Sequence, residues 1–202
     1  MKNILFDMDG VLVDYEPAVR VATIASAIGR TPADVHAAIY ESGIETAGDT
    51  GRLGADAYLD ALGRKLGTPL PESAWVEGRK RATRARGWAI DLARSLVTTC
   101  GVAVLTNNGH LLARHWPAIV PDFFPLFSAR ALVAADFGVA KPDPSVYRAA
   151  LAHLGWLAGE TLFIDDVAVN VDGAVEAGLS GHVFTGEREM RLAISRFVGT
   201  IR

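Results

Sequence analysis

The chain has 202 residues, half of them hydrophobic and 21% charged, which predicts a soluble globular protein with one large domain or a core carrying a smaller insert. A formal net charge of -3 argues against general affinity for nucleic acid or anionic membranes, so we expect neither as a partner. The single cysteine excludes an intrachain disulfide, no apolar run approaches a membrane span, and the first strand leaves no room for a signal peptide. Cytoplasm is the expected compartment.

The first predicted element is an apolar run from Ile4 to Phe6 that breaks into Asp7 and Asp9 before Gly10. Apolar runs without polar alternation are typical of strands in a parallel sheet covered on both faces. Such sheets bind ligands beyond the carboxyl ends of their strands, so we expect both carboxylates at a binding site. Asp and Gly are also common turn residues, so this segment alone does not separate a site from a turn.

Residues 15–88 have a helical character and predict an all-helical insertion with boundaries near Asp14 and Trp88. Its helices should run from Pro17 to Gly29, from Thr31-Pro32 toward Gly43, and over residues 55–66. The basic cluster at residues 79–86 is expected to be a solvated helix face, with steering of an anionic substrate as the alternative. A further helix should cover residues 88–99.

Two more apolar runs follow, and both end in polar residues: residues 102–105 precede Thr106 and Asn107, and residues 161–164 precede Asp165 and Asp166. Between them we predict a short helix, a short strand near residues 126–128 and a helix from residue 143 to residue 154. A helix to residue 178, a strand at 182–184 and a terminal helix complete the chain. Alternating strands and helices predict an α/β parallel sheet with helices on both faces.

The predicted strand ends bring together four carboxylates, and Lys141 lies in the segment Ala140-Lys141-Pro142-Asp143-Pro144 between the last two runs. Each close carboxylate pair repels by on the order of several kcal/mol at a moderate dielectric, so the site needs positive charge. Lys141 supplies one charge, and a hard divalent cation with oxygen ligands, such as Mg²⁺, supplies the rest. Taken singly, each member also fits a turn, a surface lysine or a helix N-cap.

The segment from Phe6 to Asp14, Phe-Asp-Met-Asp-Gly-Val-Leu-Val-Asp, resembles the first motif of the haloacid dehalogenase (HAD) superfamily, which is dominated by phosphatases. The remaining motifs follow in order at residues 106–107, 141 and 165–166. The last segment is similar to the branch of the soluble epoxide hydrolase phosphatase domain and bacterial sugar-phosphate phosphatases, although Asn170 stands where many relatives carry another Asp. The resemblance covers a Rossmann-like core, residues 1–14 and 89–202, and not the helical cap, residues 15–88.

This resemblance implies a Mg²⁺-dependent hydrolase of small phosphomonoesters that works through an aspartyl-phosphate. Asp7 would be the nucleophile, Asp9 the general acid and base, and Lys141 the group that neutralises charge during transfer. Thr106 and the Asn107 amide would hold phosphate oxygens. The metal would be held by Asp7, the Asp9 carbonyl and Asp166, with Asp165 in a supporting position.

Three alternatives stay open at this point. A phosphoglucomutase-like phosphotransferase would share every core motif and differ in the cap. A metal-independent 2-haloacid dehalogenase would share Asp7 but need no acid at Asp9, and a non-catalytic binding protein of this fold would be expected to lack a core group. The expected partner is a small phosphorylated metabolite, whose identity the sequence does not name. The oligomeric state also stays open.

Overall fold

The computed structural model of the chain describes residues 1–123 and 126–199. Its central feature is a five-stranded sheet in the order β5-β4-β1-β6-β7, and every strand pair in it is parallel. The strands are β1 Asn3–Phe6, β4 Gly101–Thr106, β5 Ala131–Val133, β6 Thr161–Asp165 and β7 Ser180–Val183. The predicted α/β, Rossmann-like architecture is confirmed.

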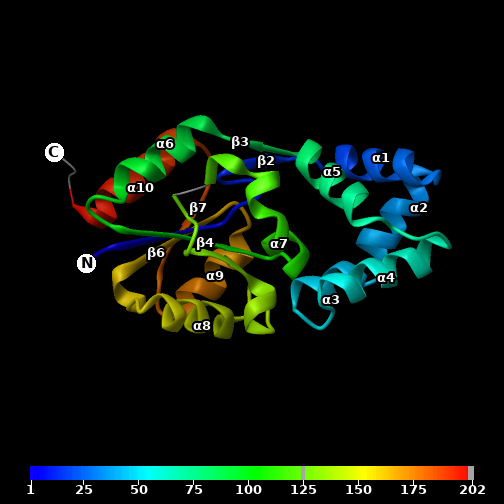
Figure 1. Cartoon of the computed structure of the whole chain (residues 1–202). Helices are drawn as coiled ribbons and strands as arrows, with labels where there is room; N and C mark the ends of the chain where they lie inside the picture. The colour runs from blue at the N-terminus through cyan, green and yellow to red at the C-terminus, as the bar shows by residue number, and fades with distance from the viewer. Residues whose placement is uncertain (124–125, 200–202) are drawn as a thin grey trace.

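The two faces of the sheet bury different side chains, because successive strand residues point to opposite sides. Ile4 and Phe6 of β1 belong to a core that includes residues of α6, Gly87–Leu96, and α10, Glu187–Val198. Leu5 belongs to a second core with residues of α8, Pro144–Leu154, and α9, Ala168–Glu176. Helices thus cover both faces, with α6 and α10 on one side and α8 and α9 on the other (Figure 1). This double coverage explains why the strands are apolar without alternation.

A group of helices between Tyr15 and Thr83 lies beside the sheet and forms the cap (Figure 1). These helices are α1 Pro17–Ile28, α2 Pro32–His36, the π-helix Ala37–Glu41, α3 Ile44–Asp49, α4 Ala55–Leu66 and α5 Glu72–Ala82. Pro17 occupies the first turn of α1, and Gly29 ends it in the left-handed region at φ 64°. Thr31 and Asp34 cap α2 reciprocally. The predicted limits of α1 and α4 are confirmed, whereas α3 was not predicted.

The insertion is not wholly helical, which corrects the expectation for its base. Strand β2, Val13–Tyr15, pairs antiparallel with β3, Thr83–Ala85, so that Asp14 lies opposite Arg84. The Asp14 carboxylate accepts hydrogen bonds from Arg84 (3.0 Å) and Arg86 (2.8 Å), which hold the two connections together. The division of the chain into a core and a cap of residues 15–88 remains a proposal. The first boundary of that cap, between Asp14 and Tyr15, falls inside strand β2.

The predicted strand near residues 126–128 was wrong, because residues 126–130 form turns and the edge strand begins at Ala131. Phe127 instead packs against Phe123, with ring centroids 5.2 Å apart, and its side chain is fully buried. The remaining elements are α7 His110–Ile119 and three 3₁₀ turns, Pro121–Phe123, Ala134–Phe137 and Ala158–Glu160. None of the helices in the described ranges has both the length and the hydropathy to cross a membrane.

Candidate active site

The candidate site lies where the three central strands end. Asp7 follows β1, Thr106 closes β4 and Asp165 closes β6, and the strand order places β1 between the other two. A cavity of about 370 Å³ opens above these ends. Its lining includes six of the seven predicted site residues, and Asp165 lies fully buried beneath it. The lining comprises Asp7, Asp9, Gly10, Tyr15, Thr106, Asn107, Lys141, Asp166, Val167 and Asn170.

Lys141 bridges two buried acids in the floor of the cavity. Its Nζ donates hydrogen bonds to Asp7 Oδ1 and Asp165 Oδ2, both at 2.7 Å. Burial alone would lower the pKa of Lys141, but the two carboxylates raise it above its usual value, so the lysine stays charged. Burial raises the pKa of Asp7 to about 7; the Lys141 ammonium opposes that shift, and the neighbouring negative charge of Asp165 adds to it. One lysine therefore leaves the site short of positive charge.

The loop that carries Lys141 is fixed from two sides. The Asn107 side chain donates to the Lys141 carbonyl and accepts from the Lys141 N–H, both at 2.9 Å. On the other side, a Cβ on Gly173 of α9 would lie 1.9 Å from the Pro142 carbonyl oxygen, so only glycine permits this approach. Because the Asn107 side-chain amide is engaged here, a phosphate contact by Asn107 would have to come from its main-chain N–H.

Asp165 and Asp166 differ in the number of hydrogen bonds that their carboxylate oxygens accept. Asp165 also accepts hydrogen bonds from the Val167 N–H (2.8 Å) and the Asn170 side chain (3.0 Å), so both of its oxygens are engaged. Asp166 is exposed, and no other described residue donates a hydrogen bond to its carboxylate. It lies against Gly10, where an added Cβ would come within 2.1 Å of Asp166 Oδ2. Although the residue is exposed overall, partial burial of its carboxyl group and the nearby Asp165 raise the pKa of Asp166.

One oxygen from each of Asp7, Asp165 and Asp166 lies within 4.8 Å of the others. Oxygen donors in this number and spacing suit a hard divalent cation. Since Asp165 is satisfied by Lys141 and Asn170, Asp7 and Asp166 have the oxygens best placed for direct coordination. The Asp9 carboxylate does not belong to this group.

The Asp9 side chain turns toward the cap. Arg79 Nη2 of α5 donates to Asp9 Oδ1 (2.8 Å) and Oδ2 (2.6 Å). Asn108 Nδ2 donates to Asp9 Oδ2 (3.2 Å) and to Thr106 Oγ1 (2.8 Å). Neither Arg79 nor Asn108 was among the predicted site residues.

The basic cluster is therefore not a uniformly solvated face, which corrects its interpretation. The Arg79 side chain is only 2% exposed, and Arg86 donates to main-chain carbonyls of Gly10 and Val11. Arg81 and Arg84 do face solvent. A signal for Arg79 was available, because it follows the buried Trp75 by four residues on the same helix and so belongs to its apolar face.

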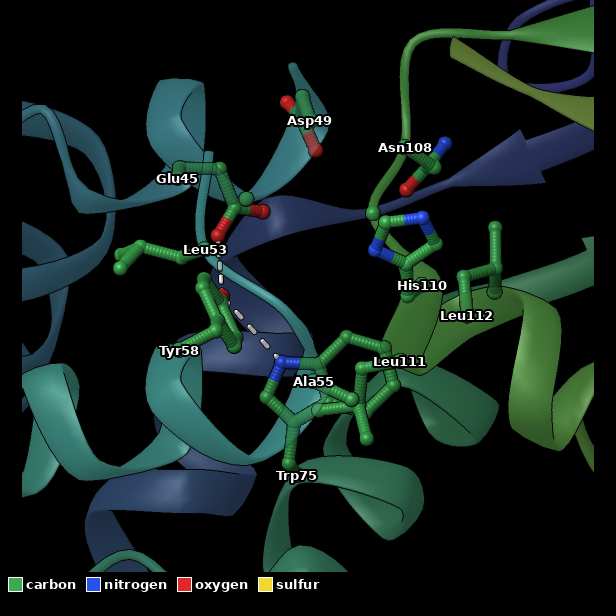
Figure 2. A pocket seen from close by; sticks show the side chains of 12 residues that line it. Glu45, Asp49, Leu53, Ala55, Tyr58, Trp75, Asn108, His110, Leu111 and Leu112 are labelled. Carbon is green, nitrogen blue, oxygen red and sulfur yellow. Dashed lines mark hydrogen bonds between the residues drawn. The ribbon is translucent and has the colours of Figure 1, made fainter. Parts of the chain in front are cut away.

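A second, smaller pocket of about 10 Å³ lies between the cap and α7, which is room for about one water. Glu45 and Asp49 lie across it from Asn108 and His110 (Figure 2). The dashed lines in Figure 2 follow the hydrogen bonds from Trp75 to Tyr58 and from Tyr58 to Glu45. Burial and the neighbouring Glu45 raise the pKa of Asp49 to about 8.

A profile of the haloacid dehalogenase-like hydrolases matches residues 1–178. D-ribitol-5-phosphate phosphatase of Bacteroides thetaiotaomicron is 26% identical over 189 residues, covering 88% of this chain and 89% of the relative. Sesquiterpene phosphatase astK of Aspergillus oryzae is 28% identical over 208 residues, covering 98% and 97%.

Solved structures agree on the fold. A HAD family enzyme of Bacteroides thetaiotaomicron in complex with magnesium and inorganic phosphate superposes with a TM-score of 0.78 at 20% identity, covering 95% of this chain and 98% of that chain. L-2-haloacid dehalogenase of Xanthobacter autotrophicus superposes with a TM-score of 0.64 at 20% identity, covering 100% and 84%. The match over residues 1–178 shows that the chain belongs to the haloacid dehalogenase-like hydrolase family.

Proposed function

We propose that the protein is a Mg²⁺-dependent phosphatase that hydrolyses small phosphomonoesters through an aspartyl-phosphate on Asp7. The observation that carries this proposal is the placement of Asp7, which follows the central strand and lies 2.7 Å from the Lys141 ammonium in the floor of an open cavity. Asp166 lies on the same cavity, close enough for its carboxylate to share a cation with Asp7. Phosphoryl transfer requires a nucleophile, a proton donor and positive charge around the phosphate, and the lining residues offer all three.

In the first step, an Asp7 oxygen attacks phosphorus, the ester P–O bond breaks, and its electron pair passes to the leaving oxygen, which takes a proton from Asp9. In the second step, Asp9 accepts a proton from water as the water oxygen attacks phosphorus, and the bond from phosphorus to Asp7 breaks. The products are the alcohol and inorganic phosphate. Asp9 serves as acid and then as base, which is worth roughly 10²–10⁴ in rate.

Charge in the site sets the role of the other groups. Lys141 would hold Asp7 in position and face the negative phosphoryl oxygens, which Thr106 and the Asn107 main chain would contact. Asp7 and Asp166 would hold Mg²⁺, with the Asp9 carbonyl and with Asp165 in support. Bound Mg²⁺ would supply the positive charge that favours ionised Asp7 and offsets charge on the transferring phosphoryl group.

The alternatives fit less well. A haloacid dehalogenase needs neither a cation nor an acid at Asp9, so that reaction would not use the cation-binding arrangement of Asp7, Asp165 and Asp166. The likeness to a solved dehalogenase concerns the fold alone. A non-catalytic protein would be expected to lack a core group, yet the described residues bring all of them together. A phosphomutase would share this site and differ in the acceptor, so the assay must separate transfer to water from transfer to a sugar phosphate.

The test is a panel of phosphomonoesters assayed for phosphate release with Mg²⁺ and with a chelator. The two named relatives are a D-ribitol-5-phosphate phosphatase and a sesquiterpene phosphatase, whose names point to chemically different esters, so the panel should include polyol, sugar, nucleotide, flavin and prenyl phosphates. We expect turnover that chelation abolishes and Mg²⁺ restores. Turnover that survives chelation would contradict the proposal, as would release of halide from chloroacetate without metal.

Asp7→Asn is the matched control for background hydrolysis, because an amide cannot accept the phosphoryl group as a carboxylate does. A phosphoryl adduct on Asp7, trapped by rapid quench and detected by mass spectrometry, would place the intermediate. If the adduct passed to a sugar phosphate faster than to water, the protein would be a mutase instead.

A further inference from the structure

Arg79 of the cap contacts a residue of the candidate site, Asp9, directly. It lies on α5, 70 residues from Asp9 in the chain, and contacts both oxygens of the Asp9 carboxylate through one nitrogen, Nη2. Its side chain is 2% exposed, and that of Asp9 is 25% exposed. A charge-assisted contact this well shielded from water is stronger and more directional than a surface ion pair.

The surroundings of Arg79 fix the guanidinium in place. Its central carbon lies 4.0 Å from the centroid of the Tyr15 ring, a cation–π contact made by the ribbon that leads into the cap. Its Nε is buried and has no hydrogen-bond partner among the described residues. An unpartnered buried donor is unfavourable, so stability of the cap alone does not account for this arginine.

The backbone beneath Arg79 is also positioned closely. At Gly78 a Cβ would lie 2.8 Å from Ile24 Cγ1 and 3.2 Å from the Arg20 carbonyl, so α5 packs tightly on α1 at this point. Two donors, Arg79 from the cap and Asn108 from the loop after β4, therefore hold the Asp9 carboxylate from different elements. Without the cap donor, the Asp9 side chain could turn about its χ angles into other orientations.

We propose that Arg79 is a positioning residue for the hydrolytic reaction: it orients the Asp9 side chain so that the protonated carboxyl group can pass its proton to the leaving oxygen and the resulting carboxylate can later take one from water. This inference rests on the proposed function of Asp9 as acid and base. Arg79 acts through Asp9 and not on the phosphate, because Asp9 and Lys141 line the cavity and Arg79 does not. Misorientation of a catalytic group by about 1 Å lowers rates on the order of 10²-fold.

The experiment is a double-mutant cycle with Arg79→Gln, Asp9→Asn and the combination, measured as kcat and KM on an alkyl phosphate and on an activated aryl phosphate. We expect Arg79→Gln to lower kcat by roughly 10- to 100-fold on the alkyl phosphate, which needs protonation of its leaving group, and by less on the aryl phosphate. KM should change little. In the Asp9→Asn background the same change should have almost no effect, because the group it positions is gone.

Arg79→Lys should restore part of kcat, since a single nitrogen makes both contacts to Asp9. Lys80→Gln, one residue further along α5 and exposed, is the matched control and should behave as wild type. Arg79→Met serves as a second variant if Arg79→Gln does not fold, as judged by circular dichroism.

The outcomes are distinguishable. Equal losses in both Asp9 backgrounds, or a change in KM alone, would overturn the positioning role while wild-type turnover still supported the phosphatase. A wild-type protein without phosphatase activity on the panel would refute the proposed function and this inference together.

Discussion

The nucleophile predicted at Asp7 should make the metal-free protein less stable as pH rises. Burial raises the pKa of Asp7 from 3.8 to about 7, and Lys141 offsets only part of that shift. The folded state therefore holds a proton on Asp7 that the unfolded chain releases. For an acid with a raised pKa, stability falls as pH rises from the unfolded value through the folded value, and the full loss is present above pH of about 7.

Asp7→Asn removes this ionisation while keeping nearly the same shape. The difference in the free energy of unfolding, variant minus wild type, should increase by about 3 kcal/mol between about pH 5 and about pH 8. Roughly two pH units of this range lie below the folded pKa of Asp7, and each contributes about 1.36 kcal/mol. Other acids with raised pKa values, such as Asp49 and Asp166, are present in both proteins and cancel in the comparison. The variant should be more stable than wild type at the higher pH and inactive.

The assay is urea unfolding of both proteins at the two pH values in the presence of a chelator, followed by circular dichroism. Asp60→Asn, an exposed acid on α4 of the cap, is the control for loss of a carboxylate outside the candidate site. Added Mg²⁺ should stabilise wild type more than the Asp7 variant, because a ligand that binds only the folded state adds to its stability. A stability difference that is the same at both pH values would refute the reasoning.

Three further predictions concern the groups around the nucleophile. Asp166→Asn should weaken Mg²⁺ binding in calorimetric titrations more than Asp165→Asn does, because the oxygens of Asp165 are already engaged; equal losses would mean that both acids coordinate directly. Gly10→Ala should also weaken Mg²⁺ binding and lower the free energy of unfolding by roughly 1–3 kcal/mol, because the φ of Gly10 is 83° and the new Cβ would meet the Asp166 carboxylate. A Mg²⁺ titration identical to that of wild type would argue against this prediction. Gly173→Ala should push the Lys141 loop away from α9 and lower the free energy of unfolding in urea by about 1–3 kcal/mol. It should also lower activity by a larger fraction than the exposed control Val175→Ala does. Equal losses of activity in the two variants would count against this prediction.

The sequence was sufficient to predict the floor of the site because that floor depends on strand ends. An apolar run without alternation predicts a parallel strand, and the carboxyl ends of neighbouring parallel strands must meet at one edge. Asp7, Thr106 and Asp165 therefore converge whatever the loops between them do. Lys141 was predicted to lie at the site because its motif follows the others in order. Asn107 was predicted to contact phosphate, and it does line the cavity, but its side chain holds the Lys141 loop instead.

The cap side of the site was not predictable in the same way. The contact between Arg79 and Asp9 joins residues far apart in the chain, and it depends on how α5 packs on α1, which no local pattern specifies. The composition of a basic run predicts a solvated helix face, but the position of each residue around the helix decides which side chain is buried. The edge strand was misplaced for a related reason, since the apolar Phe127 fills an aromatic cluster instead of pairing in the sheet.

The antiparallel pairing of β2 with β3 has a consequence for how this protein can be rebuilt. The chain leaves the core and returns to it at adjacent points, with Tyr15 opposite Thr83, so the whole insertion occupies the position of a hairpin loop. A two-residue turn such as Asn-Gly could close this ribbon in place of residues 16–82 without changing the register of the five-stranded sheet. The same junction could accept a cap from another protein, which makes it a natural point for grafting new leaving-group preferences onto an unchanged core.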